Sequence, residues 1–150
     1  MSPSISWGGS SFSIGADGTI YDYKGSELLA KNQDGSVKWS YTSDVVTDQS
    51  PVIGADGTIY IESGDGLSAI NPDGSLEWTY LDGNIGSFFS VGADGTIYVD
   101  SGMYLYAIDH SGSLKWNYPL KWWVSCSPSI GADGTVYVGD MDGELYAIGE

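Results

Sequence analysis

The sequence predicts an all-β fold built from repeated antiparallel sheets, and three observations carry that prediction. The heptapeptide Gly15–Tyr21 returns unchanged at Gly54–Tyr60 and Gly92–Tyr98, and returns with one Ile-to-Val change at Gly131–Tyr137. The first glycines of the four copies are 39, 38 and 39 residues apart. Short alternating apolar segments separated by Gly- and Asp-containing turns follow each copy, as is typical of β-sheet repeats.

Each repeat is expected to contain four short strands. The first strand precedes the heptapeptide, and a two-residue hairpin turn at Asp17-Gly18 leads to a second strand that begins at Thr19. The third strand is clearest at Leu145–Ile148, and the fourth at Ser75–Tyr80. Four antiparallel strands within one period match the size of a β-propeller blade, and such blades must stack because one alone buries too little apolar surface.

The repeats define the expected domain organisation. We expect a single propeller, or half-propeller, domain over residues 1–150, with repeats at about 10–48, 49–86, 87–124 and 125–150. In three repeats an alanine of the third strand precedes a tryptophan of the fourth by nine residues, in the pairs Ala30–Trp39, Ala69–Trp78 and Ala107–Trp116. We interpret these tryptophans as indoles docked between blades, and the alternative is packing within one blade.

The last repeat shows three of its four strands. Ser4-Ile5-Ser6-Trp7 matches the fourth-strand pattern of Ser113–Trp116, so residues 1–9 are candidates to complete the last blade and close the ring. The connection to the first strand must cross about 14 Å, which four or five extended residues, reaching at most about 17 Å, barely span. A gapless alignment instead places Trp7 over Trp123, in a loop, and both interpretations stay open.

The repeat also resembles a known family. The run Ser-Pro-x-Ile-Gly-Ala-Asp-Gly-Thr-Ile-Tyr, followed by Leu-Tyr-Ala-Ile, Asp-Gly-Ser and Leu-Lys-Trp, is similar to the pyrroloquinoline-quinone-like (PQQ-like) β-propeller repeat over nearly the whole chain. The resemblance implies seven or eight blades, whereas this chain has four. Two chains that pair into an eight-bladed ring would meet that number, and a four-bladed monomer is the alternative. The resemblance also allows a bacterial periplasmic or cell-surface location.

Quinone-dependent dehydrogenases belong to this family and, as the resemblance implies, use a disulfide of adjacent cysteines, calcium and a catalytic aspartate. Cys126 is the only cysteine, and no basic cluster is present to hold the quinone carboxylates. We therefore expect no cofactor, no metal and no enzyme activity. Asp140–Gly143 lacks the remaining ligands of a calcium loop and is interpreted as a polar turn. His110 is interpreted as a turn residue, because adjacent turn residues rarely form a catalytic triad.

Charge and hydropathy exclude further classes. The formal net charge is −15, with five lysines and no arginine, which disfavours nucleic-acid binding. No apolar run approaches the length of a membrane span, and the first residues lack the pattern of a signal peptide. We therefore expect neither nucleic acid nor membrane as a partner.

One loop departs from the repeat. Lys121-Trp122-Trp123 occupies the connection from a fourth strand to the next first strand, where the other repeats have no tryptophan. Exposed indoles stack on sugars or anchor protein partners, and the alternative is that they cover the ring seam. We expect a non-catalytic scaffold that assembles with itself as a homodimer, with a carbohydrate- or peptide-binding module as the alternative. The near-identical repeats also suit an engineered or reconstructed propeller fragment.

Overall fold

The structure is a computed structural model that describes residues 11–47, 49–64, 66–81 and 85–149. The candidate ring-closure segment Ser4–Trp7 lies outside these residues. The described part of the chain consists of strands and turns, and it contains no helix that could cross a membrane. The chain divides into two compact units, residues 1–79 and 80–150.

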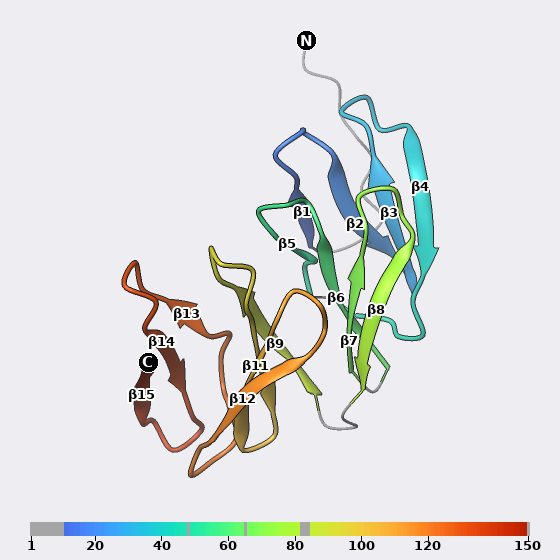
Figure 1. Cartoon of the computed structure of the whole chain (residues 1–150). Coiled ribbons are helices and arrows are strands. Elements are labelled where there is room, and N and C mark those ends of the chain that lie inside the picture. The colour runs from blue at the N-terminus through green and yellow to red at the C-terminus, as the bar shows by residue number, and fades with distance from the viewer. Residues whose placement is uncertain (1–10, 48, 65, 82–84, 150) are drawn as a thin grey trace. The chain divides into compact units, whose positions relative to one another are not determined.

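The first two repeats form two four-stranded sheets, and in each of them the strands are neighbours in chain order (Figure 1). The strands of the first sheet are β1 (Phe12–Ile14), β2 (Ile20–Lys24), β3 (Glu27–Lys31) and β4 (Val37–Thr42). Those of the second are β5 (Val52–Ile53), β6 (Ile59–Ser63), β7 (Gly66–Ile70) and β8 (Leu76–Leu81). The predicted pattern of four strands per repeat is confirmed in both sheets.

The last two repeats form a four-stranded sheet and a three-stranded sheet, again in chain order. The third sheet contains β9 (Ile85–Val91), β10 (Ile97–Ser101), β11 (Tyr104–Ile108) and β12 (Leu114–Pro119). The fourth contains β13 (Ser129–Ile130), β14 (Val136–Gly139) and β15 (Leu145–Ile148). Among the described residues β15 is an edge strand, so one row of its backbone groups faces outward.

The heptapeptide forms the hairpin between the first two strands of each sheet. The Gly15 amide donates to the Thr19 carbonyl at 2.8 Å, and the Gly18 amide donates to the Gly15 carbonyl at 2.9 Å. The loop therefore has three residues, Ala16 to Gly18, and the expected two-residue turn is wrong. Only Gly18 has a positive φ, of 82°, whereas Asp17 acts through its carboxylate, which accepts the Thr19 amide at 2.9 Å.

Two sheets pack face to face in the first unit. Tyr21, Tyr23, Leu28 and Ala30 of the first sheet form a buried cluster with Ile59, Ile61 and Ile70 of the second. We call the face that carries Tyr21 and Ala30, or their equivalents, the trailing face of a sheet. The opposite face, which carries Ile59 and Ile61 or their equivalents, is the leading face.

The second unit repeats this arrangement. Tyr98, Leu105 and Ala107 on the trailing face of the third sheet pack with Val136 and Val138 on the leading face of the fourth. Alternation along each strand produces the two faces, because successive side chains of a strand point to opposite sides. Most side chains on both faces are apolar, so the strands contain short apolar runs.

Tryptophan side chains extend these contacts in the first unit. Trp39 lies opposite Ala30 across β3 and β4, and its ring lies 5.8 Å from that of Tyr21. Its indole Nε1 donates to the Pro72 carbonyl at 2.9 Å, so the indole joins the first sheet to a turn of the second. A Cβ added to Gly74 would lie 2.7 Å from the Trp39 ring, which shows how closely this turn approaches the indole.

Candidate functional site

The connection between β12 and β13 carries the two tryptophans that the other repeats lack. Leu120 and Val124 are buried on either side of them and fix the loop. The Leu120 amide donates to the Met103 carbonyl at 2.7 Å, and the Met141 amide donates to the Trp123 carbonyl at 2.9 Å. Backbone hydrogen bonds to two neighbouring turns therefore hold the loop in a defined place.

Both indoles remain largely accessible. Trp122 is 51% exposed and Trp123 is 59% exposed. The Trp123 ring lies beside the turn between β10 and β11, where a Cβ on Gly102 would be 3.5 Å from it. Met103 and Met141, which belong to the turns that hold the loop, are also exposed. We call Met103, Trp122, Trp123 and Met141 the tryptophan surface.

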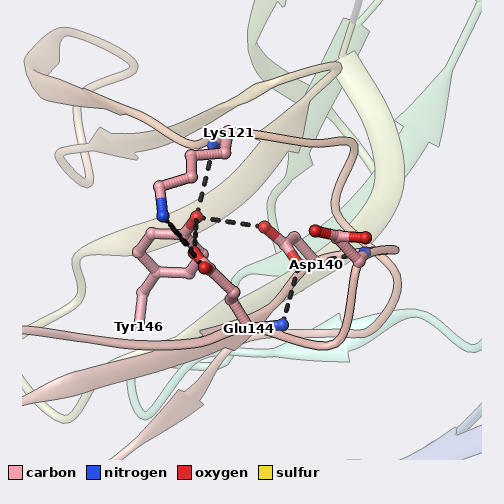
Figure 2. Close-up of polar contacts among 5 residues, drawn as sticks. Lys121, Asp140, Glu144 and Tyr146 are labelled. Carbon is pink, nitrogen blue, oxygen red and sulfur yellow. Dashed lines mark hydrogen bonds and ion pairs between the residues drawn. The ribbon is translucent and has the colours of Figure 1, made fainter.

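A polar network ties this loop to the fourth sheet (Figure 2). The Asp140 side chain is buried, and its Oδ1 accepts the backbone amides of Asp142 at 3.1 Å and Glu144 at 3.0 Å. Its Oδ2 accepts the Tyr146 hydroxyl at 3.0 Å. The carboxylate thus points toward backbone amides of its own turn, in the way that aspartates stabilise turns.

Lys121 joins the network from the loop. Its Nζ lies 2.9 Å from the Glu144 carboxylate, and its amide donates to the Tyr146 hydroxyl at 3.3 Å. The hydrogen bond to Glu144 raises the pKa of Lys121, and the same bond, with that from Tyr146, lowers the pKa of Glu144. The Tyr146 hydroxyl lies 3.0 Å from both Glu144 and Asp140, but it has one proton and donates to one carboxylate at a time.

Lys121 therefore contacts the fourth sheet of its own chain, whereas the side chains of the two tryptophans beside it remain exposed. Sequence reasoning singled out Lys121, Trp122 and Trp123 and missed Tyr146 and Met103. The hairpin connectivity could have indicated that Met103 lies near this loop. In an antiparallel sheet, the turn between the second and third strands lies at the same end as the connection that leaves the fourth strand.

The other singled-out residues lie elsewhere. The Trp78 ring is 6.0 Å from that of Tyr60, and the Trp116 ring is 5.8 Å from that of Tyr98. Cys126 is exposed, with its Sγ 4.0 Å from the Gly139 carbonyl. Among the described residues, no three His, Cys, Asp or Glu side chains come together as a metal site would require.

Trp116 lines a hollow in the second unit. The hollow has a volume of about 1160 Å³ and lies between the third and fourth sheets. Its walls include Trp116, Gly134, Ile148 and Gly149. Sequence reasoning did not predict this space, because it depends on how two sheets of the same unit pack.

Comparisons with known proteins agree on the fold. A family model described as outer membrane protein assembly factor BamB matches residues 67–150, which is more than half of the chain. No curated protein matches the sequence. The crystal structure of BamB from Moraxella catarrhalis is similar with a TM-score of 0.71 at 16% identity, over 91% of this chain and 45% of that one.

Two further solved structures are similar. A protein of unknown function from Bacteroides caccae has a TM-score of 0.61 at 15% identity, over 91% of this chain and 61% of that one. The extracellular domain of a protein described as a hybrid two-component system, from B. thetaiotaomicron, has a TM-score of 0.67 at 12% identity, over 89% of this chain. The chain spans 20% of that protein, so it covers less than two thirds of each of the three structures.

The family match agrees with the repeats, the four sheets and the contacts between sheets within each unit. The chain therefore belongs to the PQQ-like β-propeller repeat family, through the model that is described as outer membrane protein assembly factor BamB.

Proposed function

We propose that this chain is a non-catalytic β-propeller module that acts by binding polypeptide, and that its first partner is a second copy of itself. The description of the matching family model names an assembly factor, which supports a role in protein contacts. The alternative, in which the exposed tryptophans bind a separate ligand, rests on a different observation.

The observation that carries the proposal is the exposed trailing face of the fourth sheet. Leu145 is 73% exposed, whereas its equivalents Leu28 and Leu105 are completely buried against the next sheet of their own unit. Burial of a leucine side chain is worth about 1.5–3 kcal/mol, so an apolar face of this kind favours contact with another sheet. A sheet of a second copy is the partner that a propeller would place against this face.

A ring with twofold symmetry would accommodate such pairing. Two chains related by a twofold axis would place the fourth sheet of each copy against the first sheet of the other, so that the same contact occurs twice. The resulting ring would have eight blades, within the range that propellers adopt.

The mass in solution tests this proposal. Light scattering should give about twice the 15.9 kDa of one chain. Leu145→Asp should reduce the mass to that of one chain while circular dichroism retains the β spectrum. Val46→Asp is the matched control, because Val46 is an apolar side chain that is 77% exposed in the first unit, and this variant should stay dimeric. A monomeric wild-type protein would exclude the homodimer.

A second candidate function rests on the tryptophan surface. Two neighbouring indoles, both more than half exposed and held by a fixed loop, suit stacking on a sugar ring or capture of an apolar peptide side chain. The peptide would carry positive charge, since the chain has a net charge of −15.

Tryptophan fluorescence tests this second function. Oligosaccharides and lysine-containing aromatic peptides would be titrated while the emission is followed, first with the wild-type protein and then with Trp122→Ala/Trp123→Ala. A saturable change that the double variant loses supports a ligand site. An unchanged spectrum with every ligand would leave the loop without this role, whatever the oligomeric mass turns out to be.

A further inference from the structure

Two departures from the repeat meet at one end of the second unit. The first is the connection that carries Trp122 and Trp123. The second is the turn between β14 and β15, which spans residues 140–144, whereas the corresponding turns of the first and third sheets span residues 25–26 and 102–103. We call it the long turn. Its Met141 amide donates to the Trp123 carbonyl at 2.9 Å, so the two departures lie side by side.

The two indoles form the centre of the shared surface. Each is more than half exposed, although Leu120 and Val124 on either side of them are buried. The face of an indole carries negative electrostatic potential, and among aromatic side chains tryptophan binds cations most strongly. Indoles that are exposed and held by a fixed loop therefore suit a cation as well as an apolar group.

A carboxylate lies in the long turn beside these indoles. Asp142 is exposed. In the heptapeptide loops the turn aspartate accepts the amide two residues later, as Asp17 does from Thr19. Asp140 takes this part in the long turn, because its Oδ1 accepts the amides of Asp142 and Glu144. The Asp142 carboxylate forms no hydrogen bond or ion pair with the described part of the chain, so it is available to a ligand.

The local charge favours a cationic ligand. The connection between β12 and β13 and the long turn together contain one lysine and three carboxylates. The lysine is Lys121, and its Nζ is paired with Glu144 at 2.9 Å. Since Asp140 is buried, Asp142 is the exposed carboxylate of these two segments that lacks a counter-ion among the described residues. The net charge of −15 on the whole chain adds to the attraction for a cation.

The neighbouring side chains favour a peptide over a sugar. Met103 and Met141 are exposed, and methionine side chains are apolar and flexible enough to adapt to peptides of varied sequence. A sugar needs a few polar groups, placed around its ring, to hold its hydroxyls. The nearby polar side chains of Lys121, Glu144 and Tyr146 are instead bonded to one another.

We propose that the tryptophan surface and Asp142 together bind a basic side chain of a polypeptide, with its cation on the face of an indole and paired with the Asp142 carboxylate. Apolar residues next to the basic residue pack against Met103 and Met141. The proposal rests on the second function proposed above. It names a basic-apolar peptide as the ligand class of that site and adds Asp142 as the residue that determines specificity.

Arginine suits this arrangement better than lysine. The guanidinium group is planar and weakly hydrated, so it can stack on an indole while its N–H groups donate to a carboxylate. The lysine ammonium is a compact and strongly hydrated charge, which loses more hydration when it is placed on an aromatic face. The test therefore uses arginine as the basic residue.

Titration with short peptides tests the proposal. Acetyl-Leu-Arg-Leu-Arg-amide has no aromatic side chain, so a change in tryptophan emission comes from the protein. Acetyl-Leu-Gln-Leu-Gln-amide is the matched neutral peptide, and a maltose oligosaccharide is the sugar. We expect a saturable change with the arginine peptide and a dissociation constant about fivefold higher for the glutamine peptide, because the glutamine peptide lacks the cation.

Variants locate the binding site. Trp122→Ala/Trp123→Ala should remove the saturable change. Asp142→Asn should weaken binding of the arginine peptide about threefold, the size of an exposed ion pair, and should leave the glutamine peptide unaffected. Asp34→Asn is the matched control, because it removes the same charge from an exposed turn of the first unit. It should leave the affinity for both peptides unchanged.

Four results would contradict the proposal, and they separate it from the second function. Equal affinity for the arginine and glutamine peptides, or binding of the sugar alone, would leave a ligand site at the tryptophans but exclude recognition of a cation. Equal weakening by Asp34→Asn and Asp142→Asn would assign the attraction to the overall charge and not to Asp142. Failure of every ligand to bind would overturn both the proposal and the second function.

The mass in solution distinguishes a ligand site from a contact between copies. Trp122→Ala/Trp123→Ala should have the same mass as the wild type in light scattering, because the proposed homodimer uses the trailing face of the fourth sheet. A lower mass for this variant would show that the indoles contact a second copy, and would overturn the proposal that they bind a separate peptide.

Discussion

The Trp39 indole donates its Nε1 proton to the Pro72 carbonyl at 2.9 Å, across the boundary between two repeats. The bond joins a fourth strand to the turn that precedes the fourth strand of the next sheet. Gly74, two residues after Pro72, lies directly against the indole and has a φ of 89°. The contact therefore depends both on a flat aromatic side chain and on a residue without a Cβ.

Gly74→Ala should destabilise the protein by roughly 2 kcal/mol or more, because it adds both backbone strain and a clash with Trp39. Chemical denaturation followed by circular dichroism measures the loss. Gly25→Ala separates the two effects, since Gly25 has a φ of 66° and no atom within 4 Å of the added Cβ. Equal losses for the two variants would show that the close approach to Trp39 contributes nothing.

A buried ion pair lies in the first sheet. Lys31 Nζ lies 2.7 Å from Asp22 Oδ2, with side chains that are 9% and 1% exposed. Lys31→Ile should cost about 3–5 kcal/mol, because it leaves the Asp22 charge buried without compensation. The double variant Asp22→Val/Lys31→Ile copies Val99 and Ile108 of the third sheet and should be as stable as the wild type or more stable.

A double-mutant cycle on the free energy of unfolding checks this expectation. The coupling between Asp22 and Lys31 should be large, and the Asp22→Val and Lys31→Ile single variants should each lose more stability than the double variant. A double variant that is less stable than both single variants would contradict the expectation that an apolar pair can replace this ion pair. Asp22 Oδ1, which is buried without a hydrogen-bond partner among the described residues, favours the predicted outcome.

Asp140 is the centre of the network that fixes the tryptophan loop. Asp140→Ala should destabilise the protein by roughly 1–3 kcal/mol, because two amides and the Tyr146 hydroxyl lose a buried acceptor. Asp142→Ala, two residues away and exposed, is the matched control and should stay close to the wild type. Asp140→Ala should also broaden or shift the emission of Trp122 and Trp123. An unchanged spectrum would show that the network does not hold the tryptophan loop in place.

Stability should fall in acid because of the turn aspartates. Hydrogen bonds from Thr19 lower the pKa of Asp17, and the Ser36 and Ser75 hydroxyls likewise lower the pKa values of Asp34 and Asp73. A carboxyl whose folded pKa is lowered stabilises the fold above its unfolded pKa, near 3.9, and loses that contribution as pH falls through the folded value. We therefore expect a constant Tm above about pH 5 and a decline below pH 4.

Thermal melts between pH 7 and pH 2 test this dependence. They should be recorded at high salt, because protonation also relieves the repulsion within a chain of net charge −15. Asp34→Asn/Asp73→Asn should flatten the acid limb, since two titrating groups are removed from exposed turns. A Tm that rises steadily from pH 5 to pH 2 would contradict the assignment of stability to these carboxylates.

Local chemistry explains why the fold could be predicted. The heptapeptide places a turn aspartate, a left-handed glycine and the start of a strand at fixed positions, and these choices depend on neighbouring residues alone. The expected turn length was wrong because Asp17 and Gly18 were both assigned a positive φ, whereas the carboxylate of Asp17 stabilises the turn by accepting the Thr19 amide. Turn length depends on backbone hydrogen bonds that residue types alone leave open.

The site was predicted less completely. Trp122 and Trp123 could be singled out because they depart from the repeat, but their support by Tyr146 and Asp140 could not be. The turn at Asp140 looked like a polar turn or the opening of a calcium loop, and only the folded chain directs its carboxylate toward Tyr146.

The all-β repeat, its period and the positions of strands and turns could be predicted from residue types, since they follow from short-range backbone preferences. The burial and pairing of side chains instead depend on tertiary packing. Asp22 and Lys31 are nine residues apart, on neighbouring strands, and pack as a pair only because the hairpin register brings them together. The exposure of Leu145 and Tyr137, on which the proposed assembly rests, likewise depends on what each sheet has beside it, which no short stretch of sequence specifies.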